Sequence, residues 1–190
     1  DAIDFFLDRS SNREVTFITF YGGEPLANIP LIERAAAYAR ARRPHIRLSL
    51  TTNGTLLSER AMDVLARYGF DILVSLDGPP DVHDRARVDA QGRGTHPTVV
   101  RNLEKLRAAH PDYYRTQVGI VVTHESSSDL AAIRCFFDES DLFDGMRIVV
   151  NGLTEQINVF NNIIWGNTAA GDGDDIYITG TGARQMWHLS

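Results

Sequence analysis

The segment VTFITFYGGEPL, residues 15–26, carries the pattern from which the fold class follows. Its first half, Val15–Tyr21, is nearly apolar and rich in β-branched and aromatic residues, which is typical of a strand covered on both faces. Its second half turns at Gly22 and Gly23 and leads toward a helical pattern. A short apolar strand that runs into a helix is the unit from which parallel sheets are built.

The same unit recurs along the chain. Four more apolar segments predict strands at Ile46–Leu50, Ile72–Leu76, Val118–Val122 and Met146–Val150. Helical patterns lie between the strands, at Leu31–Arg43, Glu59–Tyr68, Pro97–Ala109 and Asp129–Phe137. Because such crossovers are right-handed, this order predicts one parallel α/β sheet. Periodicity leaves two architectures open, an open doubly wound sheet and part of a barrel.

Some helices allow predictions for single residues. In Leu31–Arg43, one face is predicted to be buried by the apolar residues Leu31, Ile32, Ala35, Ala36 and Ala39. Ser58 is expected to cap the next helix at its N-terminus, and Gly69 to end it. Cys135 lies in a helical pattern beside two phenylalanines, so it is predicted to be buried as a small hydrophobic residue.

Composition narrows the functional classes. The net charge of −6 argues against a nucleic-acid partner, and the basic cluster at residues 40–45 is interpreted as a solvated helix end. No apolar run of about 18 residues exists, which argues against a membrane partner. One cysteine excludes an internal disulfide framework and fits a reducing compartment, so we expect a cytoplasmic location.

Polar residues collect where the predicted strands end, which is where parallel sheets bind ligands. They lie in five places, namely Tyr21–Leu26, Thr51–Gly54, Ser75–Gly78, Thr123–His124 and Asn151. Each motif alone has an ordinary explanation, because Asn-Gly and Asp-Gly are common turns and a glutamate suits a first helical turn. Likewise, Arg87 fits either a carboxylate clamp or a surface ion pair with a nearby aspartate. Their joint placement on successive strands favours a ligand site.

Four of these motifs together resemble the radical S-adenosylmethionine superfamily, in the branch of anaerobic sulfatase maturases and SPASM-type peptide maturases. They are Tyr21–Leu26, Thr51–Leu57, Ser75–Pro79 and His83-Asp84-x-x-Arg87. The resemblance covers about residues 1–150 and implies a partial (β/α)6 barrel with about five parallel strands. It also implies an oxidoreductase that uses S-adenosylmethionine and a [4Fe–4S] cluster to modify a peptide or protein side chain.

The resemblance also implies cofactor-binding roles for nine residues, and it leaves the catalytic residues unidentified. The cofactor's ammonium group would meet Gly22, Gly23 and Glu24, and its carboxylate would be held by Ser75 and Arg87. Asn53 would lie beside the ribose, and Asp77 would order the wall of the site. Backbone groups around Val122 and Thr123 would contact the adenine.

The chain departs from the family pattern at both ends. The cluster cysteines of the family, C-x3-C-x2-C, would precede Asp1, so we expect a fragment that contains no metal ligands and does not generate the radical. Residues 151–190 lack the cysteines of a SPASM domain with its auxiliary clusters, and are predicted to form an atypical, irregular or β-rich tail. Within that tail, residues 158–168 resemble one rung of a parallel β-helix.

Three interpretations remain at this point. The first is the cofactor-binding core of a radical enzyme. The second is a non-catalytic, cluster-free binding module with a degenerate barrel. The third is an unrelated flavodoxin-like domain, which requires all four motifs to be coincidental.

Overall fold

A computed structural model describes residues 2–11, 15–124 and 129–152, with short strands at 164–165, 176–178 and 186–187. Its main feature is a parallel sheet of five strands in chain order, β1-β2-β3-β4-β5. The strands are β1 (Phe17–Phe20), β2 (Arg47–Thr52), β3 (Phe70–Ser75), β4 (Val118–His124) and β5 (Arg147–Gly152). All five predicted strands are therefore confirmed, with small shifts at their ends.

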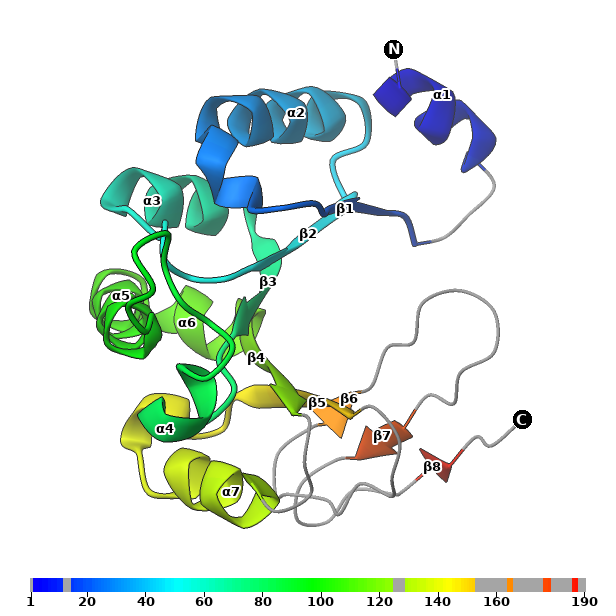
Figure 1. Ribbon diagram of the computed structural model, residues 1–190. Helices are drawn as coiled ribbons and strands as arrows, with labels where there is room; N and C mark the ends of the chain where they lie inside the picture. The colour runs from blue at the N-terminus through cyan, green and yellow to red at the C-terminus, as the bar shows by residue number, and fades with distance from the viewer. Residues whose placement is uncertain are drawn as a thin grey trace.

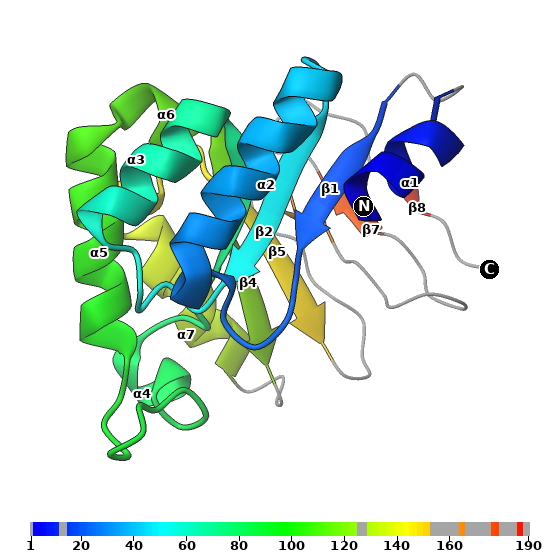
Figure 2. The ribbon, with the colours of Figure 1, turned by 90° about the horizontal axis from the view of Figure 1, so that it is seen from above.

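The helices decide between the two architectures that periodicity left open. They are α1 (Ala2–Arg9), α2 (Ile29–Arg42), α3 (Glu59–Tyr68), α4 (Pro80–His83), α5 (His96–Ala109), α6 (Pro111–Gln117) and α7 (Leu130–Asp138), with 3-10 turns η1 (Pro25–Asn28) and η3 (Asp141–Phe143). Figures 1 and 2 show the sheet as an arc whose outer side is covered by α2, α3, α5, α6 and α7. A doubly wound sheet reverses its strand order and carries helices on both faces. Sequential order with helices outside is instead the wall of a partial barrel.

The two faces of the arc differ in burial. Side chains that point to the helices, such as Leu48, Leu50 and Ile72, are almost completely buried and form the core. The inner face carries polar residues such as Arg47 and Ser49, and burial alternates along β2 accordingly. The strands are thus less apolar on one face than a strand covered on both sides would be.

The predicted ends of α3 are confirmed, whereas the predicted burial of two residues, Leu31 and Cys135, is wrong. Ser58 accepts a hydrogen bond from the backbone of Ala61 at 3.3 Å, and Gly69 ends α3 with φ of 60°. Leu31 is 52 % exposed, because α2 begins at Ile29 and buries the face one position away. Cys135 is exposed as well, since α7 turns the opposite face, that of Ile133 and Phe137, to the core.

The basic end of α2 has a structural role. Arg43 donates to the Thr16 hydroxyl at 2.5 Å and to the Ser10 carbonyl at 3.1 Å, which ties α2 to the connection after α1. Arg40 donates to the Tyr68 carbonyl at 2.8 Å and so joins α2 to the end of α3. These arginines therefore close orphan carbonyls of neighbouring elements rather than only facing water.

Beyond β5, three short strands form a separate antiparallel sheet in the order β6-β7-β8. They are β6 (Ile164–Trp165), β7 (Ile176–Ile178) and β8 (Met186–Trp187). Apart from β6, the stretch 158–168 that resembles a β-helix rung lies outside the described residues. The division of the chain at residue 150 stays a prediction, and β5 itself runs to Gly152. In the described part, no helix is both long and apolar enough to cross a lipid bilayer.

Candidate functional site

Glu24 joins the carboxyl ends of β1 and β2. Its Oε1 accepts hydrogen bonds from the Leu26 amide at 3.0 Å and the Thr52 hydroxyl at 2.7 Å, and its Oε2 accepts one from the Asn53 amide at 2.8 Å. A carboxylate offers about four acceptor positions. One position on Oε2 is therefore free, and Glu24 forms no ion pair with any residue in the described ranges.

The backbone just before Glu24 is open to a ligand. Gly22 has φ of 139°, and a Cβ built at Gly22 or at Gly23 would meet no atom within 4 Å. The neighbouring turn is held by Asn53, whose Oδ1 accepts from the Thr55 amide at 2.9 Å and the Thr55 hydroxyl at 2.7 Å. Such an Asx turn confirms the ordinary role of Asn53, and its exposed position keeps the ligand role as a prediction.

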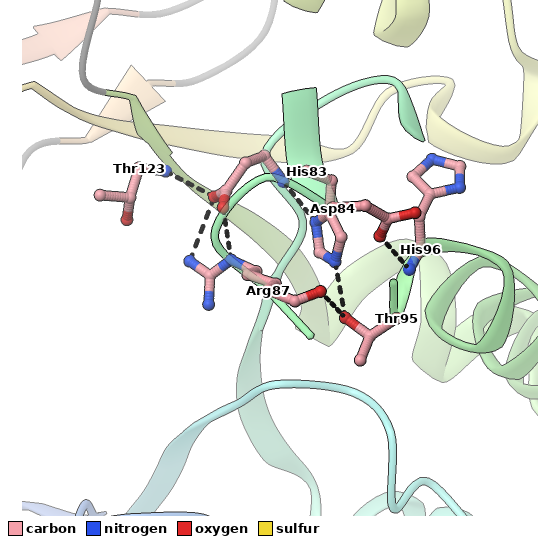
Figure 3. A network of polar contacts seen from close by, with 7 residues as sticks. His83, Asp84, Arg87, Thr95, His96 and Thr123 are labelled. Carbon is pink, nitrogen blue, oxygen red and sulfur yellow. Dashed lines mark hydrogen bonds and ion pairs between the residues drawn. The ribbon is translucent and has the colours of Figure 1, made fainter. Parts of the chain in front are cut away.

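Asp77 forms the second junction, between the ends of β3 and β4. Its carboxylate accepts the Thr123 amide at 2.7 Å and two bonds from one edge of the Arg87 guanidinium, with Nη2 at 3.1 Å and Nε on the other oxygen. Figure 3 shows Thr123, Arg87 and His83 grouped around this point. Asp77 is 4 % exposed, so its charge is buried and depends on this fork for compensation.

Arg87 therefore pairs with an aspartate, as one of the two sequence interpretations proposed, but the aspartate is buried rather than on the surface. The fork occupies Nε and Nη2 of Arg87. Its Nη1 has no partner among the residues that the structure describes. The carboxylate-clamp role of Arg87 accordingly stays a prediction that rests on this third nitrogen.

A fully buried histidine, His83, orders the loop that carries Arg87. Its Nδ1 accepts the Asp77 amide at 3.1 Å, and its Nε2 lies 3.0 Å from the Thr95 hydroxyl, which in turn donates to the Arg87 carbonyl at 3.0 Å. This chain requires the neutral imidazole with its proton on Nε2. Burial lowers the pKa of His83 from 6.5 to about 4, which keeps the ring neutral.

The far side of the same loop is held by Asp84. Its Oδ1 accepts the His96 amide at 2.9 Å, where α5 begins, so a carboxylate meets a helix N-terminus. Gly94 makes this approach possible, because a Cβ there would collide with the Asp84 carboxylate. The motif His83-Asp84-x-x-Arg87 thus works as one unit, in which the first two residues position the third.

The remaining predicted site residues lie on the strands themselves. Ser75 is buried at the end of β3, and its hydroxyl makes no hydrogen bond within the described ranges. Val122 turns its side chain into the core, so only its backbone is available for an adenine contact. Thr123, one residue on, is exposed at the end of β4 and uses its amide for Asp77.

Sequence reasoning did not single out Thr52, and it included His83 only as a letter of a motif. Thr52 donates to Glu24 and accepts the Gly54 amide at 3.0 Å, so it links the two predicted motifs. The one sequence signal for Thr52 is its place at a strand end. For His83, no signal short of the fold shows that both ring nitrogens are engaged.

The free groups match a zwitterionic ligand. Glu24 offers an unfilled acceptor at the end of β2, and Ser75 lies at the end of β3, the strand that pairs with β2; neighbouring strands are about 4.8 Å apart. Ser75 and the Nη1 atom of Arg87 are donors suited to a carboxylate. An ammonium on one side and a carboxylate on the other is the charge pattern of an amino-acid moiety.

The described residues do not form a ligand set for a metal cluster. In them, no group of three or more His, Cys, Asp or Glu side chains could hold a metal ion. Cys135, the one cysteine of the sequence, lies on the exposed side of α7. An iron–sulfur cluster requires several thiolates, so we assign no step through a cluster to these residues.

A protein-family model described as the Radical SAM superfamily matches residues 5–135. Among curated relatives, the serine-type anaerobic sulfatase-maturating enzyme of Klebsiella aerogenes is 33 % identical over 125 residues, which are 64 % of this chain and 30 % of the relative. The cysteine-type enzyme of Clostridium perfringens strain 13 is 33 % identical over 128 residues, covering 64 % and 33 %. The radical SAM cyclopropyl synthase TigE of Paramaledivibacter caminithermalis is 32 % identical over 100 residues, covering 52 % and 20 %. The chain thus spans about a third or less of these relatives.

Solved structures agree with the sequence comparison. Native anSMEcpe with bound AdoMet and a Cp18Cys peptide matches with a TM-score of 0.65 and 25 % identity, over 84 % of this chain and 45 % of that one. The same protein with AdoMet alone matches with the same TM-score. This likeness confirms the partial-barrel architecture derived above from strand order.

Proposed function

Because the chain belongs to the Radical SAM superfamily, we propose that it binds S-adenosylmethionine at the carboxyl ends of β1 to β4. We further propose that it is the core of an enzyme that modifies a peptide or protein side chain. The observation that supports this most is the zwitterionic pattern of free groups at the carboxyl ends of the strands. Glu24 has an unfilled acceptor, and Ser75 and Arg87 have donors without a partner among the described residues. The methionine moiety of S-adenosylmethionine has this charge pattern.

The chain's own residues act by binding and positioning. Glu24 accepts the ammonium group, while Gly22 and Gly23 let the backbone approach it closely. The Ser75 hydroxyl and the Arg87 Nη1 hold the carboxylate. Asn53 contacts the ribose, and the backbone at Val122 and Thr123 contacts the adenine.

Asp77 and His83 hold this arrangement rigid. Asp77 orients the Arg87 fork and joins it to β4. His83 accepts the Asp77 amide and so fixes the position of this pair. When it is bound, the cofactor supplies the radical chemistry, and the protein supplies its position. A peptide substrate is supported by the maturase relatives and by anSMEcpe, which is described with a bound peptide.

We also propose a cytoplasmic location. A free thiol on the surface of α7 is compatible with a reducing compartment. Accessibility of Cys135 to a thiol reagent added outside intact cells would contradict this location.

The cofactor site is tested by nuclear magnetic resonance on the 190-residue chain labelled with 15N. Addition of S-adenosylmethionine should shift the amide signals of Gly22, Gly23, Asn53 and Thr123, and leave those of α6 unchanged. Shifts that avoid the strand ends, or no shift at millimolar ligand, would contradict the proposed site.

A matched pair of serines sharpens the test. Ser75→Ala removes a hydroxyl that has no partner among the described residues, so the fold should survive while the affinity for S-adenosylmethionine falls roughly tenfold. Ser49→Ala removes a hydroxyl on the same sheet, bonded to Thr19 at 2.8 Å, and should leave the affinity unchanged. Equal losses in the two variants would remove Ser75 from the site.

A further inference from the structure

Arg147, at the start of β5, carries a cation with no counter-ion among the residues that the structure describes. Its Nε is shielded from solvent and has no hydrogen-bond partner, and its guanidinium forms no ion pair within the described part of the chain. Buried donors of this kind are normally satisfied. Arg147 as a whole is half-buried, so a guanidinium with a shielded, unpartnered Nε and part of its surface accessible is suited to an anionic ligand.

The neighbouring strand leaves space for this guanidinium. Gly119 on β4 pairs with Arg147, and a Cβ at Gly119 would lie 3.0 Å from Arg147 Nε and 3.0 Å from Leu73 Cδ2. Any larger residue would displace the arginine. The arginine side chain therefore lies over Gly119 of β4, on the face of the sheet opposite to the core residues Ile120 and Ile148.

The other arginine of this inner face differs in one respect. Arg47 donates to the Asp71 carboxylate at 2.8 Å, so its charge is compensated within the protein. No described carboxylate does the same for Arg147. Among the described residues, the inner face thus presents the paired guanidinium of Arg47 and the unpaired guanidinium of Arg147.

The strand register gives the offset along the strands between Arg147 and the proposed cofactor site. Arg147 pairs with Gly119, which pairs with Leu73, and Ser75 follows two residues later on β3. Two residues of strand rise about 7 Å. An anion on Arg147 would therefore lie about two extended residues below the level at which Ser75 meets the cofactor.

From this geometry we infer that Arg147 binds the carboxylate of an acidic side chain of the peptide substrate. The inference rests on the proposed function, because carboxylates are the ordinary anions of an unmodified peptide. The guanidinium fork binds a carboxylate with two parallel hydrogen bonds. The net charge of −6 disfavours polyanionic ligands such as nucleic acid.

The test uses two pentapeptides and the 15N-labelled 190-residue chain. The first is acetyl-Ala-Glu-Gly-Cys-Ala-amide, and the second has glutamine in place of glutamate. The glutamate peptide should shift the Arg147 Nε–H signal and the amides of Gly119 and Leu73, and should bind about tenfold more tightly than the glutamine peptide. Equal binding of the two peptides, or no binding of either at millimolar concentration, would overturn the inference.

Variants locate the preference on one residue. Arg147→Gln should abolish the preference for glutamate, whereas Arg47→Gln, which removes the same charge from the same face, should keep it. Arg147→Lys preserves the charge without the fork and should reduce the preference only in part, which covers the case in which the glutamine variant fails to fold. Loss of preference in Arg47→Gln to the same extent would show a diffuse electrostatic effect and contradict the assignment.

A titration with S-adenosylmethionine in the same samples separates the two proposals. Failure of the peptide arm with intact cofactor shifts overturns the inference about Arg147 alone. Failure of the cofactor shifts overturns the proposed function.

Discussion

Two carboxylates each connect the ends of neighbouring strands in this molecule, but they differ in how their charge is compensated. Glu24 joins the ends of β1 and β2, and Asp77 joins the ends of β3 and β4, each by accepting backbone amides. Asp77 is buried and neutralised by Arg87, whereas Glu24 is half-buried and has no cation among the described residues. A junction whose charge is compensated inside the protein is structural. One whose charge is left open is ready for a ligand.

The largest expected effect comes from breaking the compensated junction. Asp77→Asn leaves the Arg87 fork without its anion, and Arg87 is only 26 % exposed. We expect a loss of about 3 kcal/mol in the free energy of unfolding, measured by urea denaturation, because removing one partner of a buried pair leaves the other uncompensated.

Asp71→Asn is the matched control for this substitution. Asp71 pairs with Arg47, whose side chain is 52 % exposed, so its loss should cost at most about 1 kcal/mol. Similar losses in the two variants would show that the Asp77 junction is an ordinary surface pair.

The next effect concerns pH, since the compensated junction depends on a neutral His83. The pKa of His83 is about 4 in the folded protein because of burial, against about 6.5 unfolded. Between these values the unfolded chain binds a proton that the folded chain does not. The free energy of unfolding should therefore be highest above pH 6.5 and fall by up to about 3 kcal/mol as the pH drops to 4.

Substitution shows how much of that slope belongs to His83. His83→Gln should flatten the slope between pH 6.5 and 4, measured by urea denaturation at each pH, and His45→Gln, at an exposed histidine, should keep it. Burial also lowers the pKa of His96, so a smaller slope of the same sign should remain. An unchanged slope in His83→Gln would contradict the neutral, buried state of this ring.

The smallest effect on stability is expected at the open junction. Glu24→Gln keeps one carbonyl acceptor and loses one of the bonds to the backbone or Thr52, which should cost about 1 kcal/mol. The same change removes the charge that faces the ammonium group, so the affinity for S-adenosylmethionine should fall about tenfold by calorimetry. A large loss of stability with unchanged affinity would reverse the roles assigned to the two carboxylates.

Features that depend on residues close together in the chain could be predicted from the sequence. Helix α3 begins after Ser58 and ends at Gly69, as predicted. Such helix caps can be predicted because they depend on residues within one helical turn. The apolar segments predicted five strands because strand formation also depends on neighbouring residues. The motifs that follow these segments placed Glu24, Asn53 and Asp77 at the carboxyl ends of the parallel strands. The predicted burial of Leu31 and Cys135 was wrong because a helix pattern shifted by one residue turns a different face to the core.

Other features depend on contacts between residues far apart in the chain. The choice of a barrel wall over a doubly wound sheet follows from strand order and from the side on which each helix packs, and both are settled only when crossovers meet in space. Periodicity is the same in either architecture. The fold likewise produces the pairing of Arg87 with buried Asp77 and the two bonds of His83. It also places Arg147 over Gly119, without a counter-ion among the described residues. The sequence by itself determined which segments become strands and which polar residues follow them, because these are local properties. The tertiary structure decided which side chains are buried and which partners they pair with, and these two features set whether each charge is compensated.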